Sequence, residues 1–385
     1  MRRWLAALLG LYSLAAGVLL IRRDDENALR PVQIAVNEFS LFAALAGIVA
    51  LLMSRSRGIA LVGGVGALLS LKPLSEQPAA AEDARISMQA GLGRDYLTTI
   101  PASVKKRLLP TTWSAANATG AFLRQARARI WRDVLYASPD GIPLKLDVYQ
   151  PFIAPAIGST YPAIIAIHPG GWRNQDKGGW FEAQHRYLAS QGYVVFDIQH
   201  RLSGQARWPA QLEDVQAAIQ WVRDSAASYR VDVKRIALLG RSSGAQLALI
   251  AGLRTEQTKP VQAIISIYGL TDLKFESLPP ESPIYQLMGG AYETLPEAYR
   301  EASPVDWVQP DSPPILVIEG MQDTLVPYLH GDKLIKRLMA DAVPHALVRI
   351  PWARHGFDAA AFGLGAQLAQ YHMDRFLAYV FYGKG

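Results

Sequence analysis

A serine in the second half of the chain lies in a setting that would make it a nucleophile. Gly240-Arg241-Ser242-Ser243-Gly244 follows the apolar run 235–239 and precedes the helix-forming stretch 245–253. The G-x-S-x-G pattern alone occurs often by chance, but between a strand and a helix it is typical of a sharp turn that exposes a reactive serine. Its glycines permit the strained backbone, and the following helix directs its positive dipole end at the site. The pattern therefore predicts Ser242 as a nucleophile.

A serine hydroxyl needs a base that takes its proton and a carboxylate that orients this base. In the strand–turn–helix arrangement both partners follow the serine along the chain, which leaves four of the seven histidines. Three of these lie in helical patterns or just before a strand: His330, His345 and His372. His355 lies in a loop directly after a late apolar run, so we expect it to be the base.

The orienting carboxylate should follow the preceding strand. Asp323 lies in the segment 320–327, directly after the apolar run 315–319, and fits that position. Glu319 at the end of the run and Asp272 after an earlier one are rivals, although such carboxylates more often cap helices or lie at the surface. We expect Asp323 to be the acid of the triad.

A tetrahedral intermediate also needs amide donors for its oxyanion. The segment His168-Pro169-Gly170-Gly171-Trp172 closes an apolar run, where such a loop belongs. Pro169 has no N–H, so the predicted donors are Gly170 and Gly171, with Ser243 as a third. Removing one such donor typically lowers kcat by about 10²–10³.

Four side chains near these motifs allow two interpretations each. Trp172 and Trp180 would line the acyl or alcohol pocket or simply pack in the core, and we expect Trp172 to contact substrate. His168 fits a residue that holds the loop better than it fits a base. Arg241 would attract an anionic substrate or pair with a nearby carboxylate, and we favour the pairing.

These residues require an alternating framework to bring them together. A hairpin signal, Pro139-Asp140-Gly141, lies between the runs 134–136 and 144–149, and helical patterns cover 180–191 and 211–225. Strands alternating with helices indicate a mostly parallel sheet with helices on both faces. Residues 270–312 interrupt the rhythm and predict an insertion or lid. The later apolar runs are 163–167, 193–198, 236–239, 263–267, 315–319 and 346–350.

Seven motifs occur in one order, namely 168–172, 197–202, 208–215, 240–244, 302–305, the Asp323 segment and 355–357. Over about residues 130–380 this resembles the esterase/lipase branch of the α/β-hydrolase superfamily, which includes carboxylesterases similar to hormone-sensitive lipase, acetyl-xylan/feruloyl esterase-like enzymes, kynurenine formamidases and isoprenylcysteine methylesterases. The resemblance implies an α/β-hydrolase fold and a Ser242–His355–Asp323 triad, with no metal and no cofactor. The sequence departs from the family at Pro169, where glycine is usual, and at Arg241 and Ser243, where Asp or His and Ala are frequent.

The first 72 residues differ from the rest. Residues 4–21 carry no charge and would span roughly 27 Å as a helix, close to a bilayer core of about 30 Å. Two shorter apolar stretches follow at 39–53 and 59–71, and the first could extend to Pro31 only by placing Asn37 and Glu38 near the headgroups. We expect 1–72 to be a membrane module of three spans, with one span as the fallback. A signal peptide and a set of buried helices are the alternatives.

Basic residues are balanced between the two sides of such a module, four against four, so they leave its orientation undecided. The acidic loop 24–26 favours an inner N-terminus, which would place the C-terminal part outside the cytoplasm. Residues 73–127 resemble a connector, in which 105–107 would be a solvated loop or helix end or would rest on lipid. The catalytic domain is expected over 128–385.

Composition limits the remaining possibilities. The 385 residues are 50% hydrophobic and 19% charged, which excludes a disordered chain. The net charge of +6 is scattered and favours neither nucleic acid nor anionic lipid, so no nucleic-acid partner is expected. The absence of cysteine excludes thiol nucleophiles and disulfides. Together these features predict a membrane-anchored serine carboxylesterase or lipase acting on small-molecule or lipid esters, with membrane lipids as partners and an undefined oligomeric state. An acyltransferase, amidase or peptidase with the same triad, and a non-catalytic hydrolase-fold receptor, are the alternatives.

Overall fold

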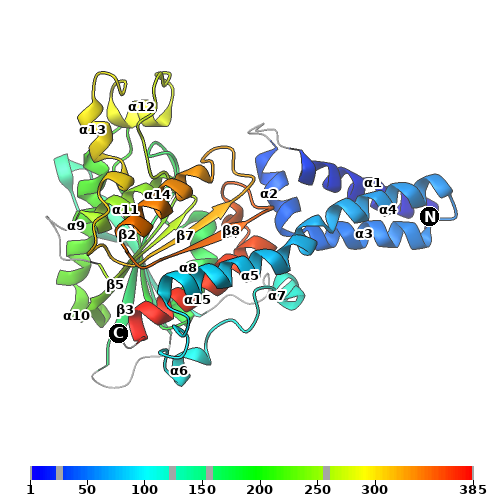
Figure 1. Cartoon of the computed structure of the whole chain (residues 1–385), viewed down its shortest axis with the longest axis horizontal. Helices are drawn as coiled ribbons and strands as arrows, with labels where there is room; N and C mark the ends of the chain where they lie inside the picture. The colour runs from blue at the N-terminus through cyan, green and yellow to red at the C-terminus, as the bar shows by residue number, and fades with distance from the viewer. Residues whose placement is uncertain (1, 23–28, 121–126, 153–158, 255–260, 384–385) are drawn as a thin grey trace.

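An eight-stranded sheet forms the centre of the C-terminal part of the chain (Figure 1). The computed structural model describes residues 2–22, 29–120, 127–152, 159–254 and 261–383. The strand order is β1-β2-β4-β3-β5-β6-β7-β8, with β2 antiparallel to both neighbours and all other pairs parallel. The strands are β1 (Ala128–Ala137), β2 (Leu144–Pro151), β3 (Tyr161–Ile167), β4 (Val194–Ile198), β5 (Val231–Arg241), β6 (Ala263–Ile267), β7 (Ile315–Gly320) and β8 (His345–Ile350).

Helices cover both faces of this sheet and make two core layers. The parallel strands β3, β4, β6 and β7 are buried at every residue, as expected for a sheet covered on both sides. One face packs against α9 (Ala210–Asp224), α11 (Ser243–Leu253) and α14 (Leu329–Ala340). The other packs against α5 (Lys72–Leu92), α8 (Glu182–Ser190) and α15 (Leu364–Tyr382). The predicted α/β class with a mostly parallel sheet is thus confirmed.

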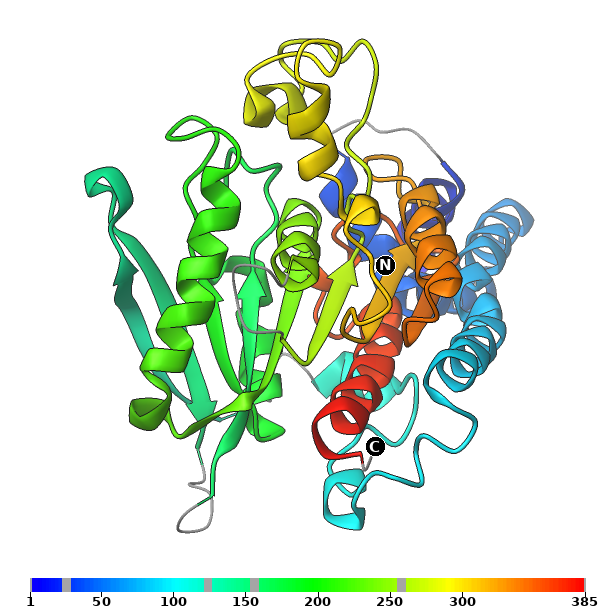
Figure 2. The same cartoon turned by 60° about the vertical axis from the view of Figure 1, so that its left-hand side comes forward.

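Between β6 and β7 the chain leaves the strand–helix alternation. It forms the short helices α12 (Pro283–Met288), α13 (Pro296–Glu301) and the 3-10 turn η3 (Pro304–Asp306). Figure 2 shows this segment, in yellow, standing beyond one end of the sheet. It occupies the position that the sequence assigned to an insertion over residues 270–312.

The N-terminal helices pack through small residues and expose large ones. They are α1 (Arg2–Ile21), α2 (Arg30–Glu38), α3 (Ser40–Met53) and α4 (Arg57–Ser70). Their buried positions are mostly Ala, Gly and Ser, whereas leucines and other large apolar side chains remain exposed. By length and composition, α1 and the run 57–92 could each cross a membrane, and α2 with α3 would make a third span if their 74° bend is one broken span.

The segment before the second apolar stretch is helical back to Arg30, but it forms the separate helix α2, which is bent by 74° from α3. Glu38 is buried against the start of α15. Its Oε2 atom accepts hydrogen bonds from two backbone N–H groups there, which offset part of its loss of water. The acidic loop 24–26 that was used for orientation lies outside the described residues.

Residues 73–92, assigned from the sequence to a connector, lie in the helix α5, which continues α4 and packs against β8 (Figure 1). The backbone N–H of Leu347 in β8 donates to Ser87 Oγ over 2.8 Å, and Gly91 lies so close to the carbonyl of His345 that a side chain there would overlap it. A helix interior normally excludes a residue such as Pro78. Here the small-residue face around Ala80 and Ala84 packs on the sheet and stabilises the helix.

Short elements complete the catalytic part of the chain. Lys105 is the last residue of α6 (Ala102–Lys105), and the Arg107 guanidinium donates to the carbonyl of Gln191 over 2.6 Å. The basic triplet 105–107 therefore includes a helix end that is tied to the part of the chain that contains the sheet. The remaining short elements are α7 (Ala115–Gly120), α10 (Ala226–Tyr229), η1 (Pro139–Gly141), η2 (Gly179–Phe181) and η4 (Phe357–Ala359).

Candidate active site

The turn between β5 and α11 holds Ser242 in a strained backbone conformation, with φ of 53° and ψ of −121°. Two close approaches make this turn possible. A Cβ on Gly240 would overlap the carbonyl oxygen of Gly244, and a Cβ on Gly244 would overlap the carbonyl oxygen of Ile167 in β3. Both glycines are therefore required by contact with neighbouring backbone, and the positive φ at a serine marks a position where strain is kept for function.

Three side chains from distant loops join at this turn. The Ser242 hydroxyl lies 2.9 Å from Nε2 of His355, and Nδ1 of His355 lies 2.6 Å from Oδ2 of Asp323. The second carboxylate oxygen of Asp323 accepts the backbone N–H groups of Leu325 and Val326, each over 2.9 Å. The loops follow β5, β7 and β8, whose carboxyl ends meet at one edge of the sheet. This is the geometry in which a serine can pass its proton to an oriented imidazole.

The rival acids are engaged elsewhere. Asp272 pairs with the ammonium group of Lys333 at 3.0 Å, away from the histidine. Glu319 is buried beside α14, and burial raises its pKa to about 8, so it is mostly protonated at neutral pH. In the part of the chain that the structure describes, Asp323 is the carboxylate that hydrogen-bonds His355.

The rival histidines are also in unsuitable surroundings. Burial lowers the pKa of His330 to about 4 and that of His372 to about 3. His345 donates from Nδ1 to the carbonyl of Val343 at 2.7 Å. His168 donates to the carbonyl of Pro169 over 2.7 Å and stacks on His200 with ring centroids 4.4 Å apart. His168 thus holds the loop in place, as the sequence suggested.

The glycine loop after β3 lies beside the serine. Gly170 has φ of 130° and Gly171 has φ of 59°, conformations that glycine adopts without strain. Both line the same cavity as Ser242 and His355. Ser243 is the first residue of α11, where a helix leaves its N–H without an intrahelical partner. Of the three predicted oxyanion donors, Gly170 and Gly171 line the cavity of Ser242, and Ser243 follows it in the chain.

Trp172 both packs in the core and lines the cavity, which were the two interpretations of this residue. Its side chain is buried in the core, and its indole N–H donates to Oε1 of Gln246 over 3.0 Å. The Gln246 amide in turn donates to the carbonyl of Ala302 over 2.8 Å, which links the glycine loop to the insertion. Part of Trp172 also lines the cavity, together with Trp180, which is 66% exposed. Trp180 is thus the more accessible of the two for a substrate.

A buried ion pair is connected through a tyrosine to the imidazole of His355. Arg241 donates from Nε to Oδ2 of Asp358 over 2.6 Å, and both side chains are almost fully buried. Oδ1 of Asp358 accepts the hydroxyl of Tyr268, whose ring lies 4.6 Å from the imidazole of His355. Arg241 therefore pairs with a carboxylate, as favoured from the sequence. Tyr268 and Asp358 were missed, although each lies close to a predicted strand end or to His355.

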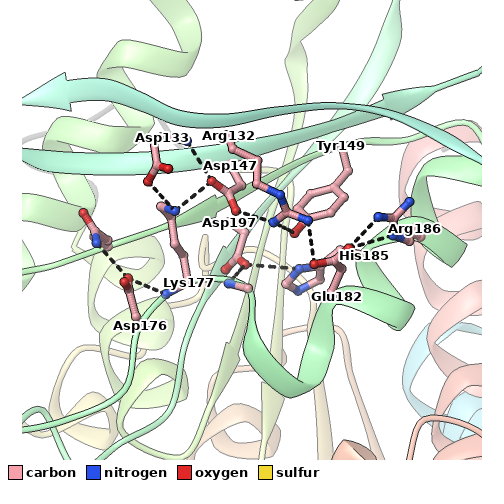
Figure 3. Close-up of polar contacts among 12 residues, drawn as sticks. Arg132, Asp133, Asp147, Tyr149, Asp176, Lys177, Glu182, His185, Arg186 and Asp197 are labelled. Carbon is pink, nitrogen blue, oxygen red and sulfur yellow. Dashed lines mark hydrogen bonds and ion pairs between the residues drawn. The ribbon is translucent and has the colours of Figure 1, made fainter.

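A second polar network fixes the loop that continues from the glycines (Figure 3). Asp147 of β2 and Asp197 of β4 lie directly opposite each other and are buried. Lys177 reaches Asp147 over 2.8 Å, and Asp197 accepts the N–H of Gly178 and lies 3.3 Å from Nδ1 of His185. Lys177 offsets the charge of Asp147, and the N–H of Gly178 ties Asp197 to the segment that leads back to the cavity wall.

The cavity beside the serine has a volume of about 650 Å³ and is mainly apolar. Its walls come from the glycine loop, the insertion, the loop after Asp323 and, unexpectedly, α2. No cluster of three metal-ligating side chains occurs among the described residues. The site therefore offers a nucleophile, a base and an apolar chamber, which suits acyl chemistry.

Comparison with known proteins places this geometry in a family. Residues 146–338 match the BD-FAE family of α/β-hydrolase esterases. The chain belongs to this family. It is 30% identical to esterase LipC of Mycobacterium tuberculosis, over 65% of this chain and 66% of the relative. It is also 30% identical to esterase LipQ of the same organism, over 66% of this chain and 62% of the relative.

This BD-FAE chain also shares its fold with solved esterases. A truncated carbohydrate esterase from gut microbiota is 25% identical, with a TM-score of 0.55, and the match covers 66% of this chain and 98% of that one. The chain spans just under two thirds of the length of the two mycobacterial relatives. The family match begins in β2 and ends in α14.

Proposed function

We propose that this BD-FAE chain is a membrane-anchored serine carboxylesterase or lipase. The observation that carries the proposal is the hydrogen-bonded series from Ser242 through His355 to Asp323, at the wall of a mainly apolar cavity. The same relay occurs in serine hydrolases of unrelated folds, because the chemistry depends on geometry and not on chain order.

The reaction follows from the positions of the atoms. Oγ of Ser242 attacks the ester carbonyl as Nε2 of His355 takes its proton, and the Asp323 carboxylate stabilises the imidazolium that forms. The tetrahedral intermediate collapses, the C–O bond to the alcohol breaks, and His355 returns the proton to the leaving oxygen. Water then attacks the acyl-enzyme with His355 as the base, which releases the acid and restores the serine.

The oxyanion would be held by backbone N–H groups. We assign this role to Gly170, Gly171 and Ser243, which lie around the nucleophile. Fixed amide dipoles in a site with little water stabilise developing charge strongly, each by about 10²–10³ in kcat. Pro169 has no N–H to donate, but the proposed set does not use a donor at that position.

Anchoring in a membrane is supported by the surface of the N-terminal helices. Large apolar side chains of α1, α3 and α4 face outward, while small residues make the helix contacts, as in membrane bundles. The far end of the bundle gathers Arg2, Arg3 and Arg55. We propose three spans, with the N-terminus in the cytoplasm and the hydrolase domain on the opposite side.

This topology can be tested in the native background, because the chain has no cysteine. Arg55→Cys places a single thiol just before α4, and Ser75→Cys places one just after it, in the first turn of α5. In intact cells, an impermeant maleimide should label the cysteine at position 75 and spare the one at position 55. The reverse pattern would invert the orientation, and labelling of both without lysis would contradict a spanning module.

Activity is tested by fluorophosphonate labelling together with a panel of p-nitrophenyl esters. The wild type should label and hydrolyse short esters, and Ser242→Ala should lose labelling and about 10⁴–10⁶ of kcat. Added alcohols would reveal acyl transfer as a new ester product, and anilides would reveal amidase action. Ester cleavage that persists in Ser242→Ala would refute the assignment, and a wild type that binds without turnover would support the receptor alternative.

A further inference from the structure

The membrane-module helix α2 forms one wall of the proposed esterase site. Pro31 and Ile34 line the cavity together with Ser242 and His355. The end of the Ile34 side chain lies 3.8 Å from where a Cβ would stand on Gly356, the residue after the proposed base. A segment from outside the hydrolase domain therefore reaches van der Waals distance of the catalytic loop.

This wall is attached to the hydrolase domain by specific contacts. Oε2 of Glu38, at the end of α2, accepts the N–H groups of Gly365 over 2.7 Å and Ala366 over 3.1 Å. These residues lie in the first turn of α15, where a helix leaves backbone N–H groups without an intrahelical partner. The guanidinium of Arg354 also donates to the carbonyl of Arg22 at the end of α1. The bundle and the loop of His355 are thus held in one arrangement.

The position of α2 relative to the spans places the cavity at the membrane surface. The 20 residues of α1 would extend about 30 Å, the thickness of a bilayer core. Its final turn, the start of α3 and the junction of α4 with α5 lie at the end of the bundle that faces the sheet, and α2 lies there at 74° to α3 (Figure 1). In a spanning arrangement this end is the lipid–water boundary.

The lining of the cavity combines apolar and polar side chains, which suits an amphiphilic substrate. Its described lining includes apolar side chains from four segments, among them Ile284 and Leu325, together with the cations Arg30 and Arg173 and no carboxylate. Two of the lining side chains are exposed, Leu325 by 48% and Trp180 by 66%. Tryptophan is favoured at membrane interfaces. An apolar chain leaving the bilayer would therefore remain in contact with apolar surface.

The side of the cavity beside α2 is the side of the proposed base. During acylation the leaving oxygen must lie within hydrogen-bond reach of Nε2 of His355, which donates the proton. Ile34 packs beside Gly356, on the base side of the serine. The glycine loop, with Gly170 and Gly171, lines the cavity where the carbonyl oxygen would be held. The chain attached to the leaving oxygen thus passes along α2.

We infer that the enzyme takes amphiphilic esters with a long-chain alcohol part from the bilayer, and that Ile34 determines this preference. The inference rests on the proposed esterase function and adds its substrate class. Hydrolysis proceeds by the steps given above: water is consumed, the acid leaves to the aqueous side, and the long-chain alcohol returns to the lipid.

The test uses the full chain in phosphatidylcholine vesicles and three esters: ethyl acetate, hexadecyl acetate and ethyl hexadecanoate. The wild type should prefer hexadecyl acetate over ethyl acetate in kcat/KM. Ile34→Trp, which fills the wall, should lower that preference about tenfold and leave the ratio of ethyl hexadecanoate to ethyl acetate within about twofold. Ile34→Ala, which adds no bulk, should lower the same preference about threefold. Val32→Trp is the matched control on the same helix, since Val32 is exposed and outside the cavity lining.

The outcomes separate the two proposals. Ser242-dependent cleavage of ethyl acetate with no preference for hexadecyl acetate would overturn the inference and leave the esterase intact. Equal effects of Ile34→Trp and Val32→Trp, or an effect confined to ethyl hexadecanoate, would also overturn it. Failure of the wild type to cleave any of the three esters would contradict the esterase function itself.

Discussion

The hydrolase domain buries its large apolar side chains, whereas the helical module exposes most of its own. In the hydrolase domain the strands bury Ile, Val and Leu between two layers of helices. In the module the helix contacts are made by residues such as Ala44, Gly47 and Gly66, and the leucines lie outside. Both regions are rich in apolar residues, so composition does not separate them. The difference separates a core that excludes water from a bundle whose outer surface is apolar, as the proposed membrane anchor requires.

The two regions nevertheless share one site. The module contributes α2 to the cavity, and the helix 57–92 runs from the bundle onto the edge of the sheet at β8. Chemistry is expected to depend on the hydrolase domain, and access and specificity on the module. Substitutions in each region should therefore change different measured quantities.

The largest effect is expected in the hydrolase domain, at Asp323. Asp323→Asn keeps the shape but removes the charge that orients His355, and should lower kcat by about 10⁴. The matched control is Asp272→Asn, because Asp272 pairs with Lys333 and makes no contact with the base in the structure. Steady-state hydrolysis of a short p-nitrophenyl ester measures both. An equal loss in the two variants would contradict the assignment of the acid.

Arg241→Met should produce the next largest effect, on stability. It leaves Asp358 buried without its cation, and such a loss typically costs about 3–5 kcal/mol of the free energy of unfolding. Urea unfolding of the full chain in detergent, followed by tryptophan fluorescence, measures the change. Arg300→Met is the control, since its pair with Glu297 is at the surface and should leave the midpoint unchanged. A stable Arg241→Met variant would show that the ion pair does not support the site.

A smaller effect is expected in the module. Gly66 packs so closely on α1 that a Cβ would overlap the backbone of Ser13 and Leu14, whereas the nearest atom to a Cβ on Gly64 would be 3.9 Å away. Gly66→Ala should destabilise the bundle by about 1–3 kcal/mol, and Gly64→Ala should not. The temperature at which the protein aggregates in detergent reports the difference. Equal behaviour of the two variants would argue against close packing of α1 with α4.

A pH dependence is expected from Glu319, which faces Arg349, Asp332 and the backbone of Gly331. Burial raises its pKa from the ordinary value of 4.5 to about 8. Between these values the folded chain holds a proton that the unfolded chain has lost, so stability falls as pH rises, by about 1.4 kcal/mol per pH unit. Glu319→Gln should flatten this fall between pH 5 and 8, and exposed Glu276→Gln should not. Parallel melting curves for wild type and Glu319→Gln across that range would exclude the buried carboxyl as its source.

Much of the framework could be predicted from the sequence. Short apolar runs between helical patterns identify the strands because both faces of a parallel sheet are buried. Parallel strands place their carboxyl ends at the same edge of the sheet, so each triad residue could be sought in the loop that follows a strand. Ser242, Asp323 and His355 were selected in this way. The structure brings them together as predicted, and their catalytic roles remain the proposal.

Other features depend on contacts that no local pattern contains. The wall formed by Ile34 requires the bundle to dock on the hydrolase domain, and the docking depends on Glu38 meeting the start of α15. The helix around Pro78 was assigned to a connector because its proline and small residues resemble a linker; the packing of its alanine face on β8 decides otherwise. Likewise, the pairing of Tyr268 with Asp358 arises only when two loops converge.

The central claim is tested most directly by trapping the acyl-enzyme. The full chain is mixed with p-nitrophenyl butyrate, quenched in acid within milliseconds to seconds, and digested for mass spectrometry. The account predicts one butyryl group on the peptide that contains Ser242, appearing with the burst of nitrophenol and absent from Ser242→Ala. Steady nitrophenol release with no acylated peptide, or acylation of a different residue, would contradict it.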